Sequence, residues 1–299
     1  MVKSARDTLA RGEWPSSCGN CAELEAQGLP SQRSRPRRYG PGISNVDIRF
    51  GNSCNLRCVS CNPVSSHSLG REASEMAQSG LIPLHPVSDT PRWDWASPET
   101  LEKLQELPIQ EVYLTGGEPM MVPETSQFLE SLSSECHVRF NTNATLWNPQ
   151  VVAQLKRFAR VNMNLSIDAF GTKNNYIRWP SDWDRIAENT QRYQDFVTVG
   201  ITATVSVLNA AYLEELWEWA EQLGIPIDLN PVLVPEWLKV SNAPHSLRSQ
   251  FTRVDGLLAE PTQQDQCDQF RLKITQLDTH RGCRIQDYLP EVAAAYGIG

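Results

Sequence analysis

Short apolar runs recur along the middle of the chain and are separated by polar or turn-forming residues. Runs of this length, rich in Val, Ile, Tyr and Phe, are typical of buried strands and too short for buried helices. We therefore predict six β-strands, at residues 46–50, 111–115, 138–142, 161–167, 200–205 and 227–232.

Between these strands, apolar residues recur at helical spacing behind recognisable helix starts. The stretch 97–107 opens on Ser97 followed by Pro98, a pattern that favours a helix N-terminus. The same reasoning predicts helices at 123–134, 148–158, 181–196 and 209–224, the last of which ends on Gly224.

Regular alternation of strand and helix implies right-handed crossovers and a parallel sheet. Six such units are too few to close an eightfold barrel. We therefore predict an α/β fold, a partial (β/α)6 barrel of the TIM type, with a doubly wound sheet as the alternative. In either fold the chemistry gathers at the carboxyl ends of the strands.

The flanking segments lack this alternation. Residues 1–45 are rich in Gly, Pro, Ser and Arg and predict an irregular N-terminal segment. Residues 46–240 form the predicted barrel domain, and residues 241–299 predict a helical C-terminal extension.

Composition limits the class of protein. The 299 residues are 40% hydrophobic and 21% charged, which is typical of a globular chain. No run of about 18 apolar residues occurs, and the first residues lack the apolar stretch of a signal peptide. We therefore expect a cytoplasmic protein with no membrane association.

The net charge of −8 argues against a nucleic-acid partner, which would require a basic face. One local exception is the group Arg33, Arg35, Arg37 and Arg38. This group is either a solvated loop or a docking patch for an acidic peptide or substrate.

Eight cysteines are unusual for a cytoplasmic protein, where disulfides seldom persist, so their clustering favours metal ligation. Cys54, Cys58 and Cys61 follow the first predicted strand with the spacing CxxxCxxC. A structural zinc site takes four ligands. Three thiolates therefore suit either zinc with a distant fourth ligand or an iron–sulfur cluster with one open iron.

A second motif, Gly116–Gly117–Glu118–Pro119, ends the second predicted strand. Two glycines there allow the backbone to approach a ligand closely. The adjacent carboxylate of Glu118 suits a ligand that carries an ammonium group.

With both motifs in these positions, the chain resembles the radical S-adenosylmethionine (SAM) enzymes from about residue 12 to residue 290. The resemblance implies that Cys54, Cys58 and Cys61 hold a [4Fe–4S] cluster whose open iron binds SAM. It also implies that the segment from Gly116 to Pro119 lines the methionine ammonium. In that family, one electron cleaves SAM to methionine and a 5′-deoxyadenosyl radical, which abstracts hydrogen from the substrate.

The resemblance extends to later strands. It implies that Asn143 and Ser166, at the ends of the third and fourth strands, contact SAM, and that Arg178 pairs with its carboxylate. Hydrogen bonding at the strand ends is the alternative role of Asn143 and Ser166, and Asp168 could cap the next segment. Ser60 stands where many members of the family carry an aromatic residue near the adenine. Because the cofactors supply the reactive groups, no catalytic acid or base is assigned.

Four further cysteines, Cys18, Cys21, Cys267 and Cys283, resemble the ligands of an auxiliary [4Fe–4S] cluster in a twitch domain, a shortened relative of the SPASM domain. A zinc ion on the same four thiolates, or free thiols, are the alternatives. We expect Cys136 to be a buried apolar side chain.

Relatives of this type imply a function in which a substrate loses hydrogen from an unactivated carbon. We expect a ribosomally made peptide that is epimerised, crosslinked or oxidised, with dehydrogenation or rearrangement of a small metabolite as the alternative. A non-catalytic zinc or iron–sulfur binding protein is the alternative of another class. We further expect an electron donor such as flavodoxin or ferredoxin as a partner, and a monomeric state.

Overall fold

A computed structural model describes residues 7–26, 43–87, 97–254 and 261–299. The chain divides into two compact units, residues 1–42 and 43–299. In the first unit, the described residues include a 3₁₀ turn, η1 (Ser16–Cys18), and helix α2 (Gly19–Ala26). The four clustered arginines, at positions 33, 35, 37 and 38, lie outside the described residues.

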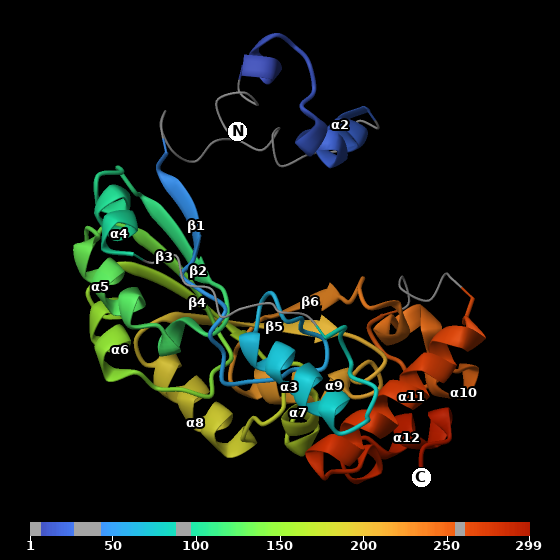
Figure 1. Ribbon diagram of the computed structural model, residues 1–299. Coiled ribbons are helices and arrows are strands. Elements are labelled where there is room, and N and C mark those ends of the chain that lie inside the picture. The colour runs from blue at the N-terminus through green and yellow to red at the C-terminus, as the bar shows by residue number, and fades with distance from the viewer. Residues whose placement is uncertain (1–6, 27–42, 88–96, 255–260) are drawn as a thin grey trace. The chain divides into compact units, whose positions relative to one another are not determined.

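The second unit is built on a six-stranded sheet (Figure 1). Its strands pair in chain order, each parallel to the next. β1 and β6 form the two edges, so the sheet is open and the predicted partial barrel is confirmed. The strands are β1 (Asn45–Arg49), β2 (Glu111–Thr115), β3 (His137–Thr142), β4 (Arg160–Ser166), β5 (Thr198–Val205) and β6 (Ile227–Pro231).

All five predicted helices are present, and three of them begin at a side chain that caps the helix. Ser97, Asn148 and Asp182 each accept a hydrogen bond from a backbone N–H of the helix that follows. These helices are α4 (Pro98–Gln105), α5 (Pro123–Ser131), α6 (Pro149–Leu155), α8 (Trp183–Gln194) and α9 (Leu213–Gln222).

The remaining helices were not singled out by periodicity. They are α3 (His67–Gln78), α7 (Thr172–Ile177), α10 (His245–Arg248), α11 (Gln264–Arg281) and α12 (Pro290–Tyr296), with 3₁₀ turns η2 (Pro119–Met121), η3 (Glu236–Leu238), η4 (Val240–Asn242) and η6 (Ile285–Asp287). α3 buries Leu69, Ala73 and Met76, whose spacing is helical, so the sequence does carry a signal for this helix. No helix in the described segments combines the length and apolar character needed to cross a lipid bilayer.

The two faces of the sheet differ in character because alternate strand residues point to opposite sides. One face, which includes Val112, Val138 and Met163, belongs to the apolar core that the helices of the crossovers share. The strand positions between them carry polar residues, Asp47, Arg49, Tyr113, Arg139, Asn141, Asn162, Asn164, Ser166, Thr202, Thr204, Asp228 and Asn230. This polar face differs from the interior of a closed eightfold barrel, which branched apolar side chains fill.

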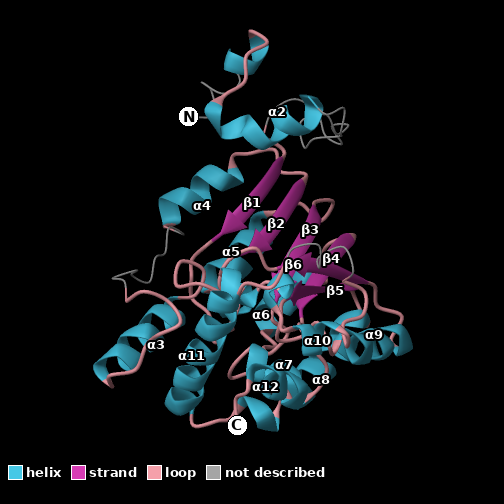
Figure 2. Cartoon of the chain, turned by 90° about the vertical axis from the view of Figure 1, so that its right-hand side faces the viewer, coloured by secondary structure: helices cyan, strands magenta, loops and turns pink. Residues whose placement is uncertain are grey.

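The C-terminal helices belong to the same unit as the sheet. α3, α7, α11 and α12 lie beyond the carboxyl ends of the strands (Figures 1 and 2). A second apolar cluster there includes Val59, Met76 of α3, Tyr176 of α7 and Phe270 of α11. The C-terminal extension therefore packs against the loop that carries the clustered cysteines.

A buried ion pair strengthens this attachment. Arg281, at the end of α11, donates through Nε and Nη2 to the two carboxylate oxygens of Glu72 on α3, over 3.0 and 2.9 Å. Their side chains are only 1% and 2% exposed. Arg281 Nη2 also donates to the carbonyl oxygen of Arg57, between Cys54 and Cys58, over 2.7 Å. Removing either partner of such a pair leaves an uncompensated buried charge, which typically costs about 3–5 kcal/mol.

Candidate active site

Cys54, Cys58 and Cys61 lie in residues 50–66, which connect β1 to α3 and which we call the cysteine loop. Arg57 N and Val59 N in this loop donate to the carbonyl oxygens of Trp179 and Ile177, at the end of α7, over 2.5 and 2.9 Å. The loop backbone is therefore fixed at the carboxyl end of the sheet without help from the thiols themselves.

All three thiols border one cavity of about 270 Å³. The cavity is also lined by strand-end residues, among them Thr115, Asn141, Ser166 and Thr204. The structure thus brings the cysteine triplet and the ends of β2 to β5 together, as expected for a site at the carboxyl edge of a parallel sheet.

The protein alone disfavours thiolates at this position. Burial raises the pKa of Cys54 to about 11 and that of Cys58 to about 12, and it also raises the pKa of Cys61. Arg178 opposes the rise at each of the three thiols. Positive charge is therefore what this cavity needs for its sulfur atoms to act as thiolate ligands.

Gly116 and Gly117 line the cavity, and both positions require glycine because the backbone of the cysteine loop leaves no room for a Cβ. Gly116 has φ +124°, and a Cβ there would lie 2.9 Å from the carbonyl oxygen of Gly51. A Cβ on Gly117 would lie 2.1 Å from the carbonyl oxygen of Ser53. The two glycines therefore let the end of β2 pack directly on the cysteine loop.

Glu118 and Pro119 are buried and are not part of the cavity lining. The Glu118 carboxylate accepts hydrogen bonds from Met120 N (3.0 Å), Thr142 Oγ1 (2.9 Å) and Asn143 N (2.7 Å). Burial raises the pKa of Glu118, and these hydrogen bonds oppose the rise. In this structure the carboxylate joins the ends of β2 and β3 rather than facing the cavity.

Asn143 and Ser166 both line the cavity. The Asn143 side chain already donates to Asn55 Oδ1 over 2.9 Å and accepts from Thr145 N and Thr145 Oγ1 over 3.0 and 2.6 Å. Asn55 Nδ2 donates in turn to Thr145 Oγ1 over 2.8 Å. Asn143 therefore ties the cysteine loop to the segment after β3.

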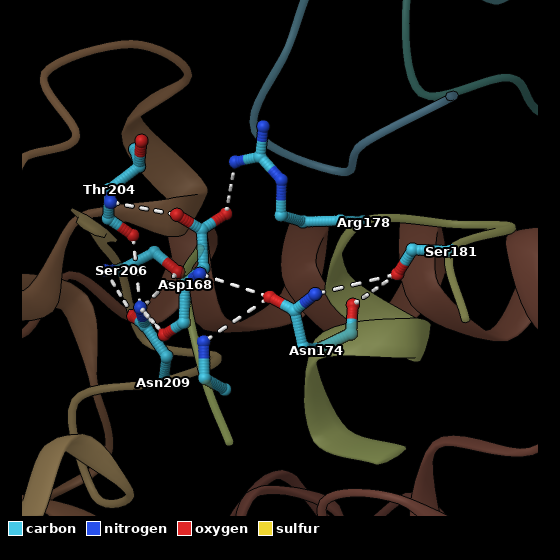
Figure 3. Close-up of polar contacts among 8 residues, drawn as sticks. Asp168, Asn174, Arg178, Ser181, Thr204, Ser206 and Asn209 are labelled. Carbon is cyan, nitrogen blue, oxygen red and sulfur yellow. Dashed lines mark hydrogen bonds and ion pairs between the residues drawn. The ribbon is translucent and has the colours of Figure 1, made fainter. Parts of the chain in front are cut away.

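Arg178, the C-cap residue of α7, also lines the cavity. Its Nη1 donates to Oδ2 of the fully buried Asp168 over 2.9 Å, while Asp168 Oδ1 accepts from Thr204 N over 2.8 Å (Figure 3). Asn209 and Asn174 bind the backbone on either side of this carboxylate. Asp168 thus holds Arg178 to the ends of β4 and β5 rather than capping α7, whose N-cap residue is Gly171.

Burial lowers the pKa of Arg178, but the charge of Asp168 and the hydrogen bond to it outweigh that effect and raise the pKa overall, so the guanidinium stays charged. Its Nε is buried and has no hydrogen-bond partner in the described part of the chain. The same holds for Oδ1 of Asn141 in the cavity lining. Two buried polar atoms without partners, one donor and one acceptor, indicate a polar ligand.

Sequence reasoning missed Asn141 and the role of Asp168. Asn141 lies two residues before Asn143 on β3, so strand alternation alone places both side chains on the same face. Asp168 lies two residues after Ser166, but its pairing with Arg178 depends on how α7 folds back, which no local pattern encodes.

The residues present fit the two groups that the sequence implies. Three cavity-lining thiols can ligate an iron–sulfur cluster and leave one iron open. Arg178 Nε can donate to a carboxylate, and Asn141 Oδ1 can accept from an ammonium or a hydroxyl group. Ser60 also lines the cavity, so no aromatic side chain stands at that position.

Two of the four remaining predicted ligands, Cys267 and Cys283, lie at opposite ends of α11. Cys267 lies in the first turn of α11, buried, and its Sγ contacts the carbonyl oxygen of Asn242 at 3.2 Å. Cys283 follows the other end of α11, where its Sγ contacts Asp278 Oδ1 at 3.6 Å. The helix between them keeps the two thiols about 20 Å apart, so they cannot bind one cluster in this arrangement.

Cys18 and Cys21 lie in the first unit, in η1 and α2. Among the described residues, no group of three or more His, Cys, Asp or Glu side chains is placed to hold a single metal ion. Cys136 is buried, as expected, at 2% exposure.

Comparison with known proteins adds independent information. A probable GTP 3′,8-cyclase of Methanocella arvoryzae is 26% identical over 190 residues, 60% of this chain and 51% of that protein. An AdoMet-dependent heme synthase of Methanosarcina barkeri is 24% identical over 176 residues, 57% of this chain and 45% of that protein. The chain thus spans about half the length of these curated relatives.

Among solved structures, anSMEcpe with bound AdoMet is similar with a TM-score of 0.49 and 17% identity, over 67% of this chain and 52% of that one. Streptococcus suis SuiB bound to S-adenosylmethionine is similar with a TM-score of 0.45 and 16% identity, over 90% and 55%. The family model of the Radical SAM superfamily matches residues 48–223, more than half of the chain. This chain therefore belongs to the Radical SAM superfamily, a family that implies a [4Fe–4S] cluster and SAM.

Proposed function

We propose that this protein is a radical SAM enzyme whose cluster is held by Cys54, Cys58 and Cys61, and that its substrate is a peptide. When bound, the reduced cluster and SAM supply a 5′-deoxyadenosyl radical that abstracts hydrogen from the substrate. The observation that carries the proposal is the single cavity that joins three thiols to two buried polar atoms without partners.

The chain's own residues have distinct tasks in this proposal. The cysteine loop, fixed by α7 and by Gly117, holds the thiols at the end of the sheet. Arg178, oriented by Asp168, presents Nε to the SAM carboxylate, and Asn141 Oδ1 accepts from the ammonium or a ribose hydroxyl.

The polar face of the sheet supports a peptide as substrate. This face continues from the cavity lining toward the amino ends of the strands through Tyr113, Arg139, Asn164 and Thr202. Amide and hydroxyl side chains can both donate to and accept from a peptide backbone. A small metabolite is the second candidate, because the similar GTP 3′,8-cyclase and heme synthase are named for reactions of small molecules.

A deuterium-transfer experiment tests the proposal. Anaerobic, cluster-loaded protein is incubated with SAM, dithionite and fully deuterated cell extract, split into a peptide fraction and a small-molecule fraction. We expect 5′-deoxyadenosine that carries deuterium with the peptide fraction only. Deuterium transfer from the small-molecule fraction alone would show that the substrate is a metabolite and not a peptide. If the cluster-loaded protein formed no 5′-deoxyadenosine, the non-catalytic alternative would be favoured.

The Arg178→Lys substitution should weaken SAM binding about tenfold, which corresponds to about 1.4 kcal/mol. Lysine keeps the positive charge beside Asp168 but lacks the planar fork whose Nε is free to donate. Equilibrium dialysis of SAM with the cluster-loaded protein measures the effect. The matched control, Arg185→Lys on the exposed surface of α8, should bind SAM normally; equal affinities for all three proteins would remove Arg178 from the SAM site.

A further inference from the structure

Cys54 borders a second cavity as well as the first. This second cavity, of about 620 Å³, is lined by Ser53, Cys54, Asn55, Arg57, His67, Ser68, Arg71, Glu75 and Met121. None of the SAM-site residues proposed above, Gly116, Gly117, Asn141 or Arg178, takes part in it. Cys54 is thus the one predicted cluster ligand that lines both cavities.

The second cavity has more basic than acidic side chains in its lining. Arg57, Arg71 and His67 line it together with a single carboxylate, Glu75. Arg71 is exposed on α3, and the Arg57 side chain is 30% exposed. Glu72, which binds Arg57 at 3.5 Å, is shared with the buried Arg281, so it does not neutralise both arginines.

This local positive charge contrasts with the net charge of −8 on the chain. An acidic protein that approaches most of the surface is repelled, whereas a basic rim attracts it and orients it. Met121, 41% exposed in the lining of the same cavity, adds an apolar contact. A small contact with charged and apolar parts is typical of transient electron-transfer complexes.

We propose that this second cavity and its rim are the docking site of an acidic, low-potential electron-carrier protein, which delivers its electron at Cys54. The inference rests on the proposed function. No bond forms or breaks in the step: the carrier is oxidised by one electron and the iron–sulfur centre is reduced by one. Docking at this cavity brings the carrier to Cys54, the predicted cluster ligand that lines it.

The test compares two reductants in one pair of variants. The rate of cluster reduction is followed by stopped-flow absorbance with a reduced bacterial flavodoxin and, separately, with dithionite. For Arg71→Glu we expect a flavodoxin rate at least about tenfold lower at 50 mM KCl, a difference that largely disappears at 500 mM KCl. The dithionite rate should be unchanged. The control, Arg185→Glu on α8, makes the same charge change elsewhere and should leave both rates unchanged.

A binding measurement makes the result independent of turnover. Titration calorimetry with oxidised flavodoxin should show weaker binding for Arg71→Glu and wild-type binding for Arg185→Glu. Equal effects of both variants, or no effect of either, would overturn the docking site. If cluster-loaded wild-type protein formed no 5′-deoxyadenosine with dithionite, the proposed function itself would be contradicted, because that reductant does not need to dock.

Discussion

Replacing Cys58 with alanine should abolish SAM cleavage and remove about four irons per chain. Cys58 is the most buried of the three thiols that line the cavity. Without it, only two cysteines are left for a [4Fe–4S] cluster that needs three, because its fourth iron must stay open for SAM. Iron analysis and 5′-deoxyadenosine formation of anaerobic protein measure the effect. We expect less than about 1% of wild-type activity.

Cys136→Ala is the matched control, because Cys136 is also buried but lies at the amino end of β3, away from the cavity. It should keep its iron and its activity. If Cys58→Ala retained all of its iron, or if wild-type protein held zinc at the triplet, the assignment of the cluster to this loop would be wrong.

Gly117→Ala should destabilise the protein by about 3 kcal/mol or more, at the upper end of what overpacking costs. The added Cβ would lie 2.1 Å from the Ser53 carbonyl oxygen and 2.9 Å from the carbonyl carbon of Asn52, both backbone atoms that cannot rotate away. The loop must then leave the end of β2 and break the hydrogen bond from Glu118 N to the Ser53 carbonyl, 2.8 Å long. The midpoint of urea unfolding measures this loss.

Gly200→Ala provides the comparison, because a Cβ on this strand glycine meets nothing closer than Asn164 Oδ1 at 3.5 Å. Its stability should stay within about 0.5 kcal/mol of wild type. A Gly117→Ala protein that unfolded at the wild-type midpoint would show that the loop can move away from β2 at little cost.

Much of the fold could be predicted because its signals are local. Apolar runs predicted all six strands, and the predicted helices that open on Ser97 and Asn148 are capped by these residues in the structure. α3 was missed although Leu69, Ala73 and Met76 recur on its buried face at helical spacing. What no local pattern indicates is the burial of the charged Glu72 beside them. Glu72 is buried because Arg281, 209 residues later, pairs with it.

The site shows the same limit. Short sequence motifs were enough to identify Cys54, Cys58 and Cys61 and the two glycines at 116 and 117. All five residues line the cavity. The orientation of a side chain depends on tertiary contacts instead. The Glu118 carboxylate therefore bonds to Thr142 of β3 and to Asn143 N, and α11 keeps the predicted ligands Cys267 and Cys283 apart.

The pairing of Arg281 with Glu72 and with the Arg57 carbonyl has a consequence for biosynthesis. A nascent chain forms the cysteine loop early, but its clamp arrives only when residue 281 leaves the ribosome. Until then the loop is held by its hydrogen bonds to the end of α7, from Arg57 N and Val59 N, without the ion pair. The attachment of the C-terminal helices to the cysteine loop is therefore completed only after the whole sheet has been translated.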